Sequence, residues 1–315
     1  MYWSIERQVE QGKLISPITG SSLVLDRDGG HLCTVDGGER YRILHGKIPL
    51  LVVDEGLTER YVNSSPTMVD KYQPETLSGQ ETVLGRLKAS TFRDCRTKES
   101  VDGFNALFTG LAESALCLSI GGGPTRPHPS LVNVNIGPFP NVDVVADAHR
   151  LPYAANSVDV IYCEAVLEHL QDPLRAVREM HRVLSKNGQL FACTPFLQAY
   201  HGYPNHYQNF SLTGHRHLFE TVGFTVVRSG VCVGPVYTLV NLIATFIHEY
   251  APTALRWPLR KAWGLAGVLL RPLDKILGAR DNAYVLASTT YLVAVKAEDV
   301  GGATTGDGAP SSDLG

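Results

Sequence analysis

The sequence predicts an α/β protein with a doubly wound, mostly parallel, seven-stranded sheet of the Rossmann-like kind. Two observations carry this prediction. From residue 101 onward, apolar runs alternate with helical patterns, and most runs are continuous, which is typical of strands covered on both faces. The joints between runs and helical patterns are short, as strand–helix–strand units of a parallel sheet require.

Seven apolar runs are the expected strands, in chain order 115–120, 131–136, 142–146, 158–163, 189–194, 224–227 and 291–295. A helix is expected after the fourth strand, because Asp172 suits a helix cap and Pro173 suits the first turn. Asn187-Gly188 is expected to end that helix. A second helix is expected over 212–222.

Composition describes an ordinary globular protein. The 315 residues are 44% hydrophobic and 19% charged, which is enough for one large core or two. The net charge of −3 gives no general attraction to nucleic acid, and we expect no nucleic-acid partner. Six cysteines without CxxC spacing and an N-terminus without an apolar signal region favour a cytoplasmic location.

The chain divides into four parts by pattern. A small β module with Asp-Gly-Gly turn signals is followed by a polar linker with a helical lead-in, the main domain, and a tail that is disordered by composition. The main domain contains a helical insertion or cap before its last strand. The boundaries are 1–55, 56–100, 101–298 (insertion 235–280) and 299–315.

Three consecutive glycines follow the first expected strand: Gly121, Gly122 and Gly123. A dinucleotide fingerprint would need glycine at position 126, which is Arg126, and a phosphate loop would need Gly-Lys-Ser/Thr, whereas Pro124 and Thr125 follow. One interpretation is a plain turn between two buried strands. The other is a site for a ligand without phosphates, which can approach closely because glycine has no Cβ.

Polar residues stand at the ends of the next strands, where ligands of doubly wound sheets bind. Asn135 suits the hydroxyls of a ribose, Asp147 suits an exocyclic amine, and the backbone of Ala148 suits a ring nitrogen. Glu164 and then Glu168 follow the fourth strand. Each residue alone could be a solvated loop position, but together they predict a site for an adenosine with an amino-acid tail.

The segment 146–196, ADAHRLPYAANSVDVIYCEAVLEHLQDPLRAVREMHRVLSKNGQLFACTPF, resembles class I S-adenosylmethionine-dependent methyltransferases of the type-11 family. The matching motifs are Asp147-Ala148, Leu151-Pro152-Tyr153, Val166-Leu167-Glu168-His169, Glu179, Arg182-Val183-Leu184 and Asn187-Gly188. The resemblance covers about residues 115–233. It implies an antiparallel last strand over 289–296 and S-adenosylmethionine as the cofactor. The implied cofactor-binding residues are Ser119, Gly121, Gly122, Gly123, Asn135, Asp147, Ala148 and Glu164.

Two residues depart from the pattern of the family. Ser119 and Asn135 stand where acidic residues are usual, and the loss of a charge-assisted hydrogen bond would weaken cofactor binding by about 1–2 kcal/mol. Only residues 124–130 join the first two strands, which is too short for a crossover helix. The alternative is therefore a catalytically inactive binding or activator subunit with a methyltransferase fold.

The N-terminal module is similar to the small zinc-ribbon-like domain that activates some methyltransferases. Tyr41-Arg42-Ile43, Gly46 and Ile48-Pro49-Leu50-Leu51 match its pattern. Ser16 and Thr19 occupy the positions of its first two cysteines, and Cys33 is the only cysteine of the region. One thiol cannot form a four-ligand zinc site, so we expect a module without metal.

The loop after the fifth strand, PFLQAYHGYPNHYQNFS at 195–211, contains the first candidates for catalysis. Methyl transfer to a hydroxyl requires a positioned acceptor and a base, and histidine suits the latter near neutral pH. His201 and His206 are the leading candidates, with His169 third, although each could instead be a structural histidine. We expect a small-molecule or glycan acceptor, and no metal.

The insertion at 235–280 is apolar and helical, with three prolines as breaks. Polar residues within its apolar stretch argue against a membrane span. A cap over the site or a homodimer face is the leading interpretation. Lysine and arginine residues that alternate with Trp257, Trp263 and leucines favour a second interpretation, peripheral contact with a membrane.

Overall fold

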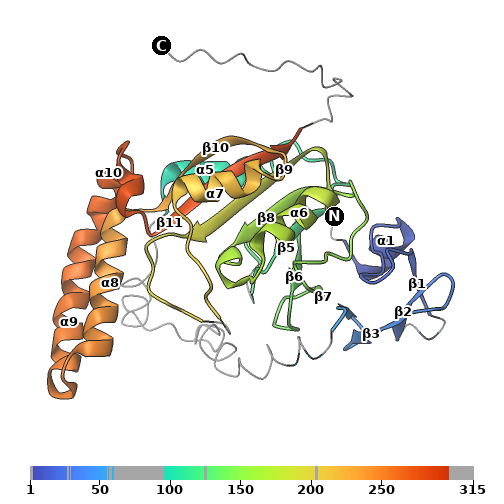
Figure 1. Cartoon of the computed structure of the whole chain (residues 1–315), viewed down its shortest axis with the longest axis horizontal. Coiled ribbons are helices and arrows are strands. Elements are labelled where there is room, and N and C mark those ends of the chain that lie inside the picture. Colours follow the sequence, from blue (N-terminus) through green and yellow to red (C-terminus); the bar gives the residue numbers. More distant parts are fainter. Residues whose placement is uncertain are drawn as a thin grey trace, which may run out of the picture.

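The computed structural model describes residues 3–26, 28, 30–54, 56, 59, 96–123, 126–202 and 205–297. Seven strands form the main part of its sheet (Figure 1): β5 (Cys117–Ile120), β6 (Leu131–Asn135), β7 (Val144–Ala146), β8 (Val158–Glu164), β9 (Leu184–Pro195), β10 (Phe224–Val233) and β11 (Thr289–Lys296). Their spatial order is β7-β6-β5-β8-β9-β11-β10. The strands β5 to β9 pair in parallel, and β11 is antiparallel to both of its neighbours, as the sequence predicts.

The sheet is larger than the seven strands expected. Four N-terminal strands extend it to eleven, in the order β1-β2-β3-β4 followed by β7. They are β1 (Leu23–Leu25), β2 (His31–Thr34), β3 (Arg40–Leu44) and β4 (Ile48–Leu51). The extension arises because β4 pairs in parallel with β7, Leu50 opposite Val145 and Leu51 opposite Ala146. This pairing satisfies backbone groups that an edge strand would otherwise expose.

The N-terminal module also shares the main hydrophobic core. Trp3, Leu14 and Leu32 belong to the same buried cluster as Leu118 and Val144. The helix α1 (Ile5–Glu10) is joined to the main domain by hydrogen bonds, since the Tyr153 hydroxyl donates to Gln8 Oε1 at 3.0 Å. The module is therefore built into the domain.

A network of polar side chains surrounds the turn at 16–19 of the module. Ser16 is buried and hydrogen-bonds to the Glu39 carboxylate and, at 2.9 Å, to the Tyr41 hydroxyl. Its Oγ also accepts hydrogen bonds from the backbone N–H groups of Ile18 and Thr19, each at 3.0 Å. Burial, together with the Glu39 carboxylate, raises the pKa of Tyr41 to about 12. A polar network thus joins the turn at 16–19 to β3 at the positions where the resemblance would place cysteines.

Helices cover both faces of the sheet. The helices α6 (Pro173–Val183) and α7 (Leu212–Glu220) lie on the face of Leu118, Ile161 and Leu190. The helix α5 (Lys98–Ala106) lies on the face of Cys117 and Tyr162. Neighbouring residues of one strand therefore serve two different cores, which explains the continuous apolar runs.

Two expected boundaries are wrong. The helix α6 starts as expected, with the Asp172 side chain as its cap, but it ends at Val183, and β9 begins at the next residue. Asn187-Gly188 therefore lies inside β9, where Asn187 has a φ of 60° and the register against β8 is irregular. The sixth strand extends to Val233 rather than to 227.

The insertion forms a helical hairpin beside the sheet, at the left of Figure 1. It consists of α8 (Pro235–Tyr250) and α9 (Thr253–Leu270), followed by η3 (Arg271–Leu273) and α10 (Asp274–Leu277). Among the described residues, none of the helices is both long and apolar enough to cross a membrane. Most of the expected linker at 56–100 and the tail at 299–315 lie outside the described residues.

Asp274 fixes the base of the hairpin. Its carboxylate accepts hydrogen bonds from the backbone N–H groups of Val236 and Tyr237, both at 2.8 Å, and satisfies donors that the first turn of α8 leaves unpaired. A Cβ on Gly234 would collide with this carboxylate. Asp274 is 5% exposed, and burial raises the pKa of its carboxyl group.

We expect Asp274→Ala to lower the free energy of unfolding by about 1–3 kcal/mol, because it leaves two N–H groups without an acceptor. Urea denaturation of the purified chain measures this change. Asp281→Ala removes a carboxylate from an exposed position nearby and serves as the control. Equal stabilities for the two variants would show that Asp274 does not hold α8.

Candidate functional site

The strand order brings the polar strand ends to one edge of the sheet. Since β6, β5 and β8 are parallel neighbours, their carboxyl ends point the same way. Ser119 is opposite both Asn133 on β6 and Tyr162 on β8. The next residues toward this edge are the glycine loop, Asn135 and Glu164.

The glycine loop has no room for a side chain at Gly121 or Gly122 and is open at Gly123. Gly121 and Gly123 have φ values of 70° and 58°, a region that favours glycine. A Cβ on Gly121 would collide with the Val166 side chain, and one on Gly122 would lie 2.5 Å from Ser119 Oγ. Among the described residues, no atom would lie within 4 Å of a Cβ on Gly123. The backbone is therefore bare and open at Gly123, as close approach of a ligand requires.

Asn133 holds this loop, and sequence reasoning missed it. Its Nδ2 donates to the Gly123 carbonyl at 2.9 Å and to the Asn141 carbonyl at 3.1 Å. Its backbone N–H donates to Asp143, at 2.7 Å, and Asp143 forms an ion pair with Arg126 at 2.8 Å. The signal available in the sequence was an amide within the apolar run LVNVN, and the structure shows that this amide is fully buried.

Two buried polar atoms lie beneath the loop without a partner. Ser119 Oγ and Asn133 Oδ1 have no hydrogen bond among the described residues, and both would lie within 3.1 Å of a Cβ at Gly122. Buried polar groups are normally paired. These two can therefore bind a polar ligand group or a water molecule.

Asn135 and Asp147 end neighbouring strands. Asn135 is opposite Val145 in the register of β6 and β7, and its Oδ1 accepts a hydrogen bond from the Ile136 N–H at 2.8 Å. Asp147 accepts from the His149 N–H at 2.9 Å and pairs with His149 Nδ1 at 2.7 Å. Burial opposes ionisation of Asp147, but the interactions with His149 keep its pKa below the ordinary value. Asp147 is therefore an ionised acceptor at neutral pH.

Two further predicted residues lie at the same edge. Ala148, next to Asp147, is half-buried and packs against the main core. Glu164 forms an ion pair with Arg96 and accepts a hydrogen bond from the Tyr162 hydroxyl. Both of its carboxylate oxygens thus have protein partners, and a role for Glu164 with the cofactor stays a prediction.

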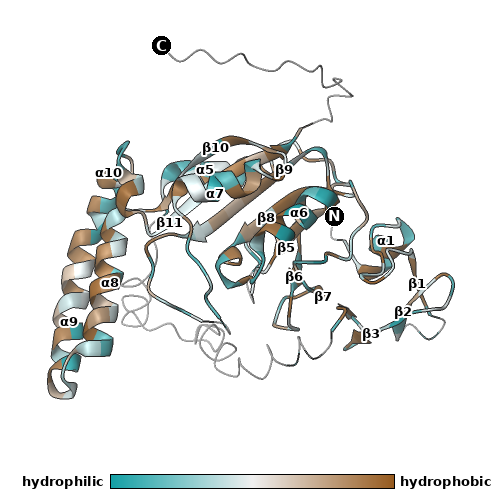
Figure 2. Ribbon diagram, viewed as in Figure 1, coloured by the Kyte–Doolittle hydropathy of each residue, from teal (hydrophilic) through white to brown (hydrophobic). Residues whose placement is uncertain are grey.

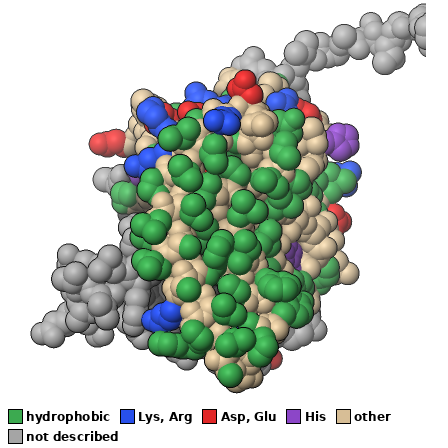
Figure 3. Space-filling view, turned by 90° about the vertical axis from the view of Figure 1, so that its left-hand side faces the viewer, with side chains coloured by type: hydrophobic (Ala, Val, Ile, Leu, Met, Phe, Trp, Pro, Cys, Tyr) green, Lys and Arg blue, Asp and Glu red, His purple; other side chains and the backbone are tan. Residues whose placement is uncertain are grey.

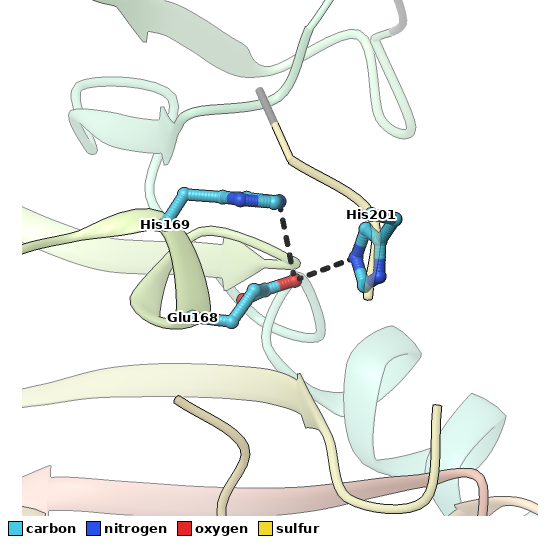
Figure 4. Close-up of side chains that lie close together, drawn as sticks. All are labelled: Glu168, His169 and His201. Carbon is cyan, nitrogen blue, oxygen red and sulfur yellow. Dashed lines mark ion pairs between the residues drawn. The ribbon is translucent and has the colours of Figure 1, made fainter. Parts of the chain in front are cut away.

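Three side chains converge beside this edge (Figure 4). Glu168 lies in the short helix η2 (Leu167–His169), and its side chain is fully buried. Its Oε1 is 3.7 Å from His169 Nε2 and 3.9 Å from His201 Nε2. His201 comes from the loop after β9, so the cluster joins the ends of two parallel neighbours, β8 and β9.

The hydrogen bonds of both histidines direct lone pairs toward Glu168. His169 Nδ1 is 2.7 Å from the Asn205 carbonyl, and His201 Nδ1 is 2.9 Å from the Ala199 carbonyl. A carbonyl accepts only, so each Nδ1 carries the hydrogen and each neutral ring presents the lone pair of its Nε2. Glu168 Oε1 has no hydrogen bond among the described residues. The two Nε2 atoms therefore face Glu168 Oε1, which has room for a proton donor or a cation.

His206 differs from the other two candidates. Its Nδ1 accepts a hydrogen bond from the His201 N–H at 3.2 Å, and its Nε2 lies 2.6 Å from Asn209 Oδ1. Both nitrogens are thus engaged. His206 thus contacts both the backbone of His201 and the side chain of Asn209.

Burial lowers the pKa of His169, although the charge of Glu168 opposes the shift. The imidazole is therefore neutral at neutral pH and can accept a proton. The ligand atoms of Glu168, His169 and His201 also lie within 4.8 Å of one another, which is close enough to hold a divalent ion after a small contraction. The cluster can thus supply a base or, alternatively, three metal ligands.

We expect Gly121→Ala to weaken the binding of S-adenosylhomocysteine by more than about tenfold, because the new methyl group must displace Val166 beneath the loop. Titration calorimetry measures the affinity. Gly110→Ala is the matched control, since Gly110 has a similar φ of 72° but a Cβ there would meet no atom within 4 Å. A similar loss in both variants would attribute the effect to backbone strain alone.

Comparison with known proteins supports the methyltransferase resemblance. Residues 129–192 match the type-11 family model, which is described as a methyltransferase domain. This match spans the end of the glycine-loop joint, Asn135, Asp147 and the Glu168–His169 motif. No curated protein matches the chain.

Solved structures with a similar fold are distant in sequence. A Galdieria sulphuraria protein assigned as a sarcosine dimethylglycine methyltransferase is 15% identical, covers 64% of this chain and 84% of that chain, and has a TM-score of 0.41. A chain from the complex of the Haloferax volcanii Trm112 methyltransferase activator with a methyltransferase is 16% identical. The match covers 68% of this chain and 95% of that chain, with a TM-score of 0.43. Haemonchus contortus phosphoethanolamine N-methyltransferase 2, in complex with phosphomonomethylethanolamine and S-adenosylhomocysteine, is 12% identical. The match covers 67% of this chain and 56% of that chain, with a TM-score of 0.39.

At these identities and TM-scores, none of the three structures bears on the reaction of this chain. The sequence motifs, the strand order and the family match agree with one another. Residues 129–192 therefore resemble a type-11 methyltransferase domain, and this match supports S-adenosylmethionine as the cofactor.

Proposed function

We propose that this protein transfers a methyl group from S-adenosylmethionine to a hydroxyl group of a small-molecule or glycan acceptor. The observation that carries the proposal is the position of the Glu168, His169 and His201 cluster next to the glycine loop and the strand ends. Three proton-accepting atoms beside a cofactor site suit a reaction in which the acceptor loses a proton.

The proposed cofactor site uses the residues at the edge of the sheet. Asn135 binds the ribose hydroxyls, and Asp147 and the backbone of Ala148 bind the adenine. Ser119 and the bare backbone at Gly123 face the amino-acid end. The support is the open surroundings of Gly123, the unpaired Ser119 Oγ and the ionised Asp147.

The bound cofactor supplies a methyl group on a positively charged sulfur. Transfer of this methyl group to the acceptor oxygen would leave S-adenosylhomocysteine as the second product. The acceptor proton passes to Nε2 of His201 or His169, and the Glu168 carboxylate stabilises the imidazolium that forms. His206 keeps His201 in place through the hydrogen bond to its backbone N–H.

An inactive binding or activator subunit is the alternative function. Ser119 and Asn135 in place of acidic residues favour it, as does the short joint between the parallel strands β5 and β6, whose described residues (121–123 and 126–130) contain no helix. This alternative requires co-purification with a separate enzyme and no methyl transfer to any acceptor. Transfer of labelled methyl to a product in cell extract, detected by mass spectrometry, would exclude it.

We expect S-adenosylhomocysteine to bind in calorimetry, and Asn135→Asp to bind it about tenfold more tightly, because a carboxylate accepts stronger hydrogen bonds from ribose hydroxyls than an amide. The new carboxylate still offers an oxygen to the Ile136 N–H. Asn135→Ala is the paired variant and should weaken binding. Absence of binding at millimolar ligand would reject the cofactor site.

We expect the double variant His201→Ala/His206→Ala to lose at least about 100-fold in turnover, because the general base and its support are removed. Affinity for S-adenosylhomocysteine should not change. His217→Ala, at an exposed position on α7, is the control. Undiminished turnover of the double variant would reject the role of this loop.

The pH dependence separates the two candidate bases. Because the pKa of His169 lies below the ordinary value of 6.5, His169 becomes protonated, and stops accepting protons, only in more acidic solution. Turnover of His201→Asn should therefore be flat near neutral pH and fall below pH 6.5.

We expect a chelator to leave the turnover of the wild-type protein unchanged. A loss of turnover that one divalent ion restores would instead identify the cluster of Glu168, His169 and His201 as a metal site.

A further inference from the structure

The α8–α9 hairpin exposes an extended apolar face (Figure 3). On α8, the exposed apolar residues recur at helical spacing and form one stripe: Leu239, Leu242, Ile243, Phe246 and Tyr250. The corresponding residues of α9 are Leu255, Trp257, Leu259, Leu265, Val268 and Leu269. Phe246, Trp257 and Leu269 are 63%, 70% and 72% exposed. A face of this extent marks an interaction site.

Packing within the hairpin does not require this face. The two helices meet on another side, where a Cβ on Gly267 would lie 2.9 Å from Val240 Cγ1. The Trp263 indole N–H donates to the Val240 carbonyl at 2.9 Å. The exposed apolar side chains are therefore available for a partner, and the ribbons of α8 and α9 are brown along much of their length in Figure 2.

The charges of the hairpin indicate an anionic partner. Residues 235–280 contain six lysine and arginine residues and two acidic ones, a net charge of +4 in a chain whose net charge is −3. Asp274 is buried as the cap of α8, and Glu249 is paired with His248 at 2.7 Å. Arg260 and Lys261 have no ion pair among the described residues, and Lys261 lies 5.7 Å from the centre of the Trp257 ring.

A groove between the two helices adds a specific feature. Its volume is about 210 Å³, and its lining combines Arg260, Asn241 and Thr245 with the apolar Val240 and Trp263. A guanidinium group and neutral donors beside an apolar wall suit a phosphate that carries a hydrophobic group.

We propose that the α8–α9 hairpin docks onto the surface of a bilayer that contains anionic phospholipid. The apolar stripes lie in the interface, the basic residues contact the head groups, and Arg260 binds a lipid phosphate in the groove. Interfacial helices combine these features. A second copy of the chain would bring two 235–280 segments together, each with a net charge of +4, and the like charges oppose that arrangement.

The position of the hairpin connects this surface to the site. The strand β10 is parallel to β9, because both are antiparallel to β11. The helix α8 begins two residues after the carboxyl end of β10 and is thus rooted at the edge of the sheet that carries the histidine cluster (Figure 1). Docking itself does not depend on methyl transfer.

Flotation of the full chain with vesicles tests the proposal. We expect binding to phosphatidylcholine vesicles that contain about 30% phosphatidylglycerol, and at least about tenfold weaker binding to phosphatidylcholine alone or in high salt. Inorganic phosphate should not displace the protein, because the apolar stripes contribute to binding. Lack of binding to the mixed vesicles, or equal binding to both kinds, would overturn the proposal.

Two double variants separate the contributions of the apolar and the basic residues to vesicle binding. Trp257→Ser/Leu269→Ser removes exposed apolar groups and should weaken vesicle binding more than about tenfold. Arg260→Gln/Lys261→Gln should reduce mainly the preference for phosphatidylglycerol, by about tenfold. Val35→Ser, at a 70% exposed position of the N-terminal module, is the control and should bind normally.

Light scattering after size-exclusion chromatography tests whether a second copy of the chain, and not a bilayer, covers the apolar face. We expect the same mass for the wild type and for Trp257→Ser/Leu269→Ser. A wild-type dimer that this variant converts to a monomer would assign the face to a second copy and overturn the proposal. Since all substituted positions are exposed, melting temperatures close to the wild-type value will verify folding of each variant.

Discussion

Parallel pairing of β5 with both β6 and β8 is the constraint on which the site depends. It puts the glycine loop, Asn135 and the turn before Glu168 at one edge, although 12 to 47 positions of the sequence separate them. The same pairing buries Ser119 beside Asn133 and explains why Asn133 can hold the Gly123 carbonyl. The site thus rests on hydrogen bonds of the sheet, with few contributions from mobile side chains.

The chemistry beside this edge follows from how two backbone carbonyls orient two rings. The Ala199 and Asn205 carbonyls engage the Nδ1 atoms of His201 and His169, so the opposite nitrogens face the buried Glu168. A buried carboxylate oxygen without a hydrogen-bond donor, such as Glu168 Oε1, is costly inside a protein. Such a group persists where a ligand or a transferred proton completes it.

Local patterns in the sequence predicted the elements and the strand ends, since apolar runs, Asp172-Pro173 and the glycine loop are local signals. The pairing of β4 with β7 could not be predicted this way, because neither segment encodes the register of the other. The expected end of α6 at Asn187-Gly188 was wrong because the same dipeptide suits both a helix end and an irregularity within a strand. The sequence favours His206 over His169 because it shows neither the contact with Asn209 nor the unpaired oxygen of Glu168.

The pairing of β4 with β7 has a consequence for how the N-terminal module acts. Two parts of one chain remain associated at any dilution, because linkage converts association into an intramolecular event. The module contacts the strand that leads into Asp147. Any support that the module gives to the Asp147 carboxylate is therefore present in every copy of the chain. It does not vary with concentration, as support from a separate subunit would.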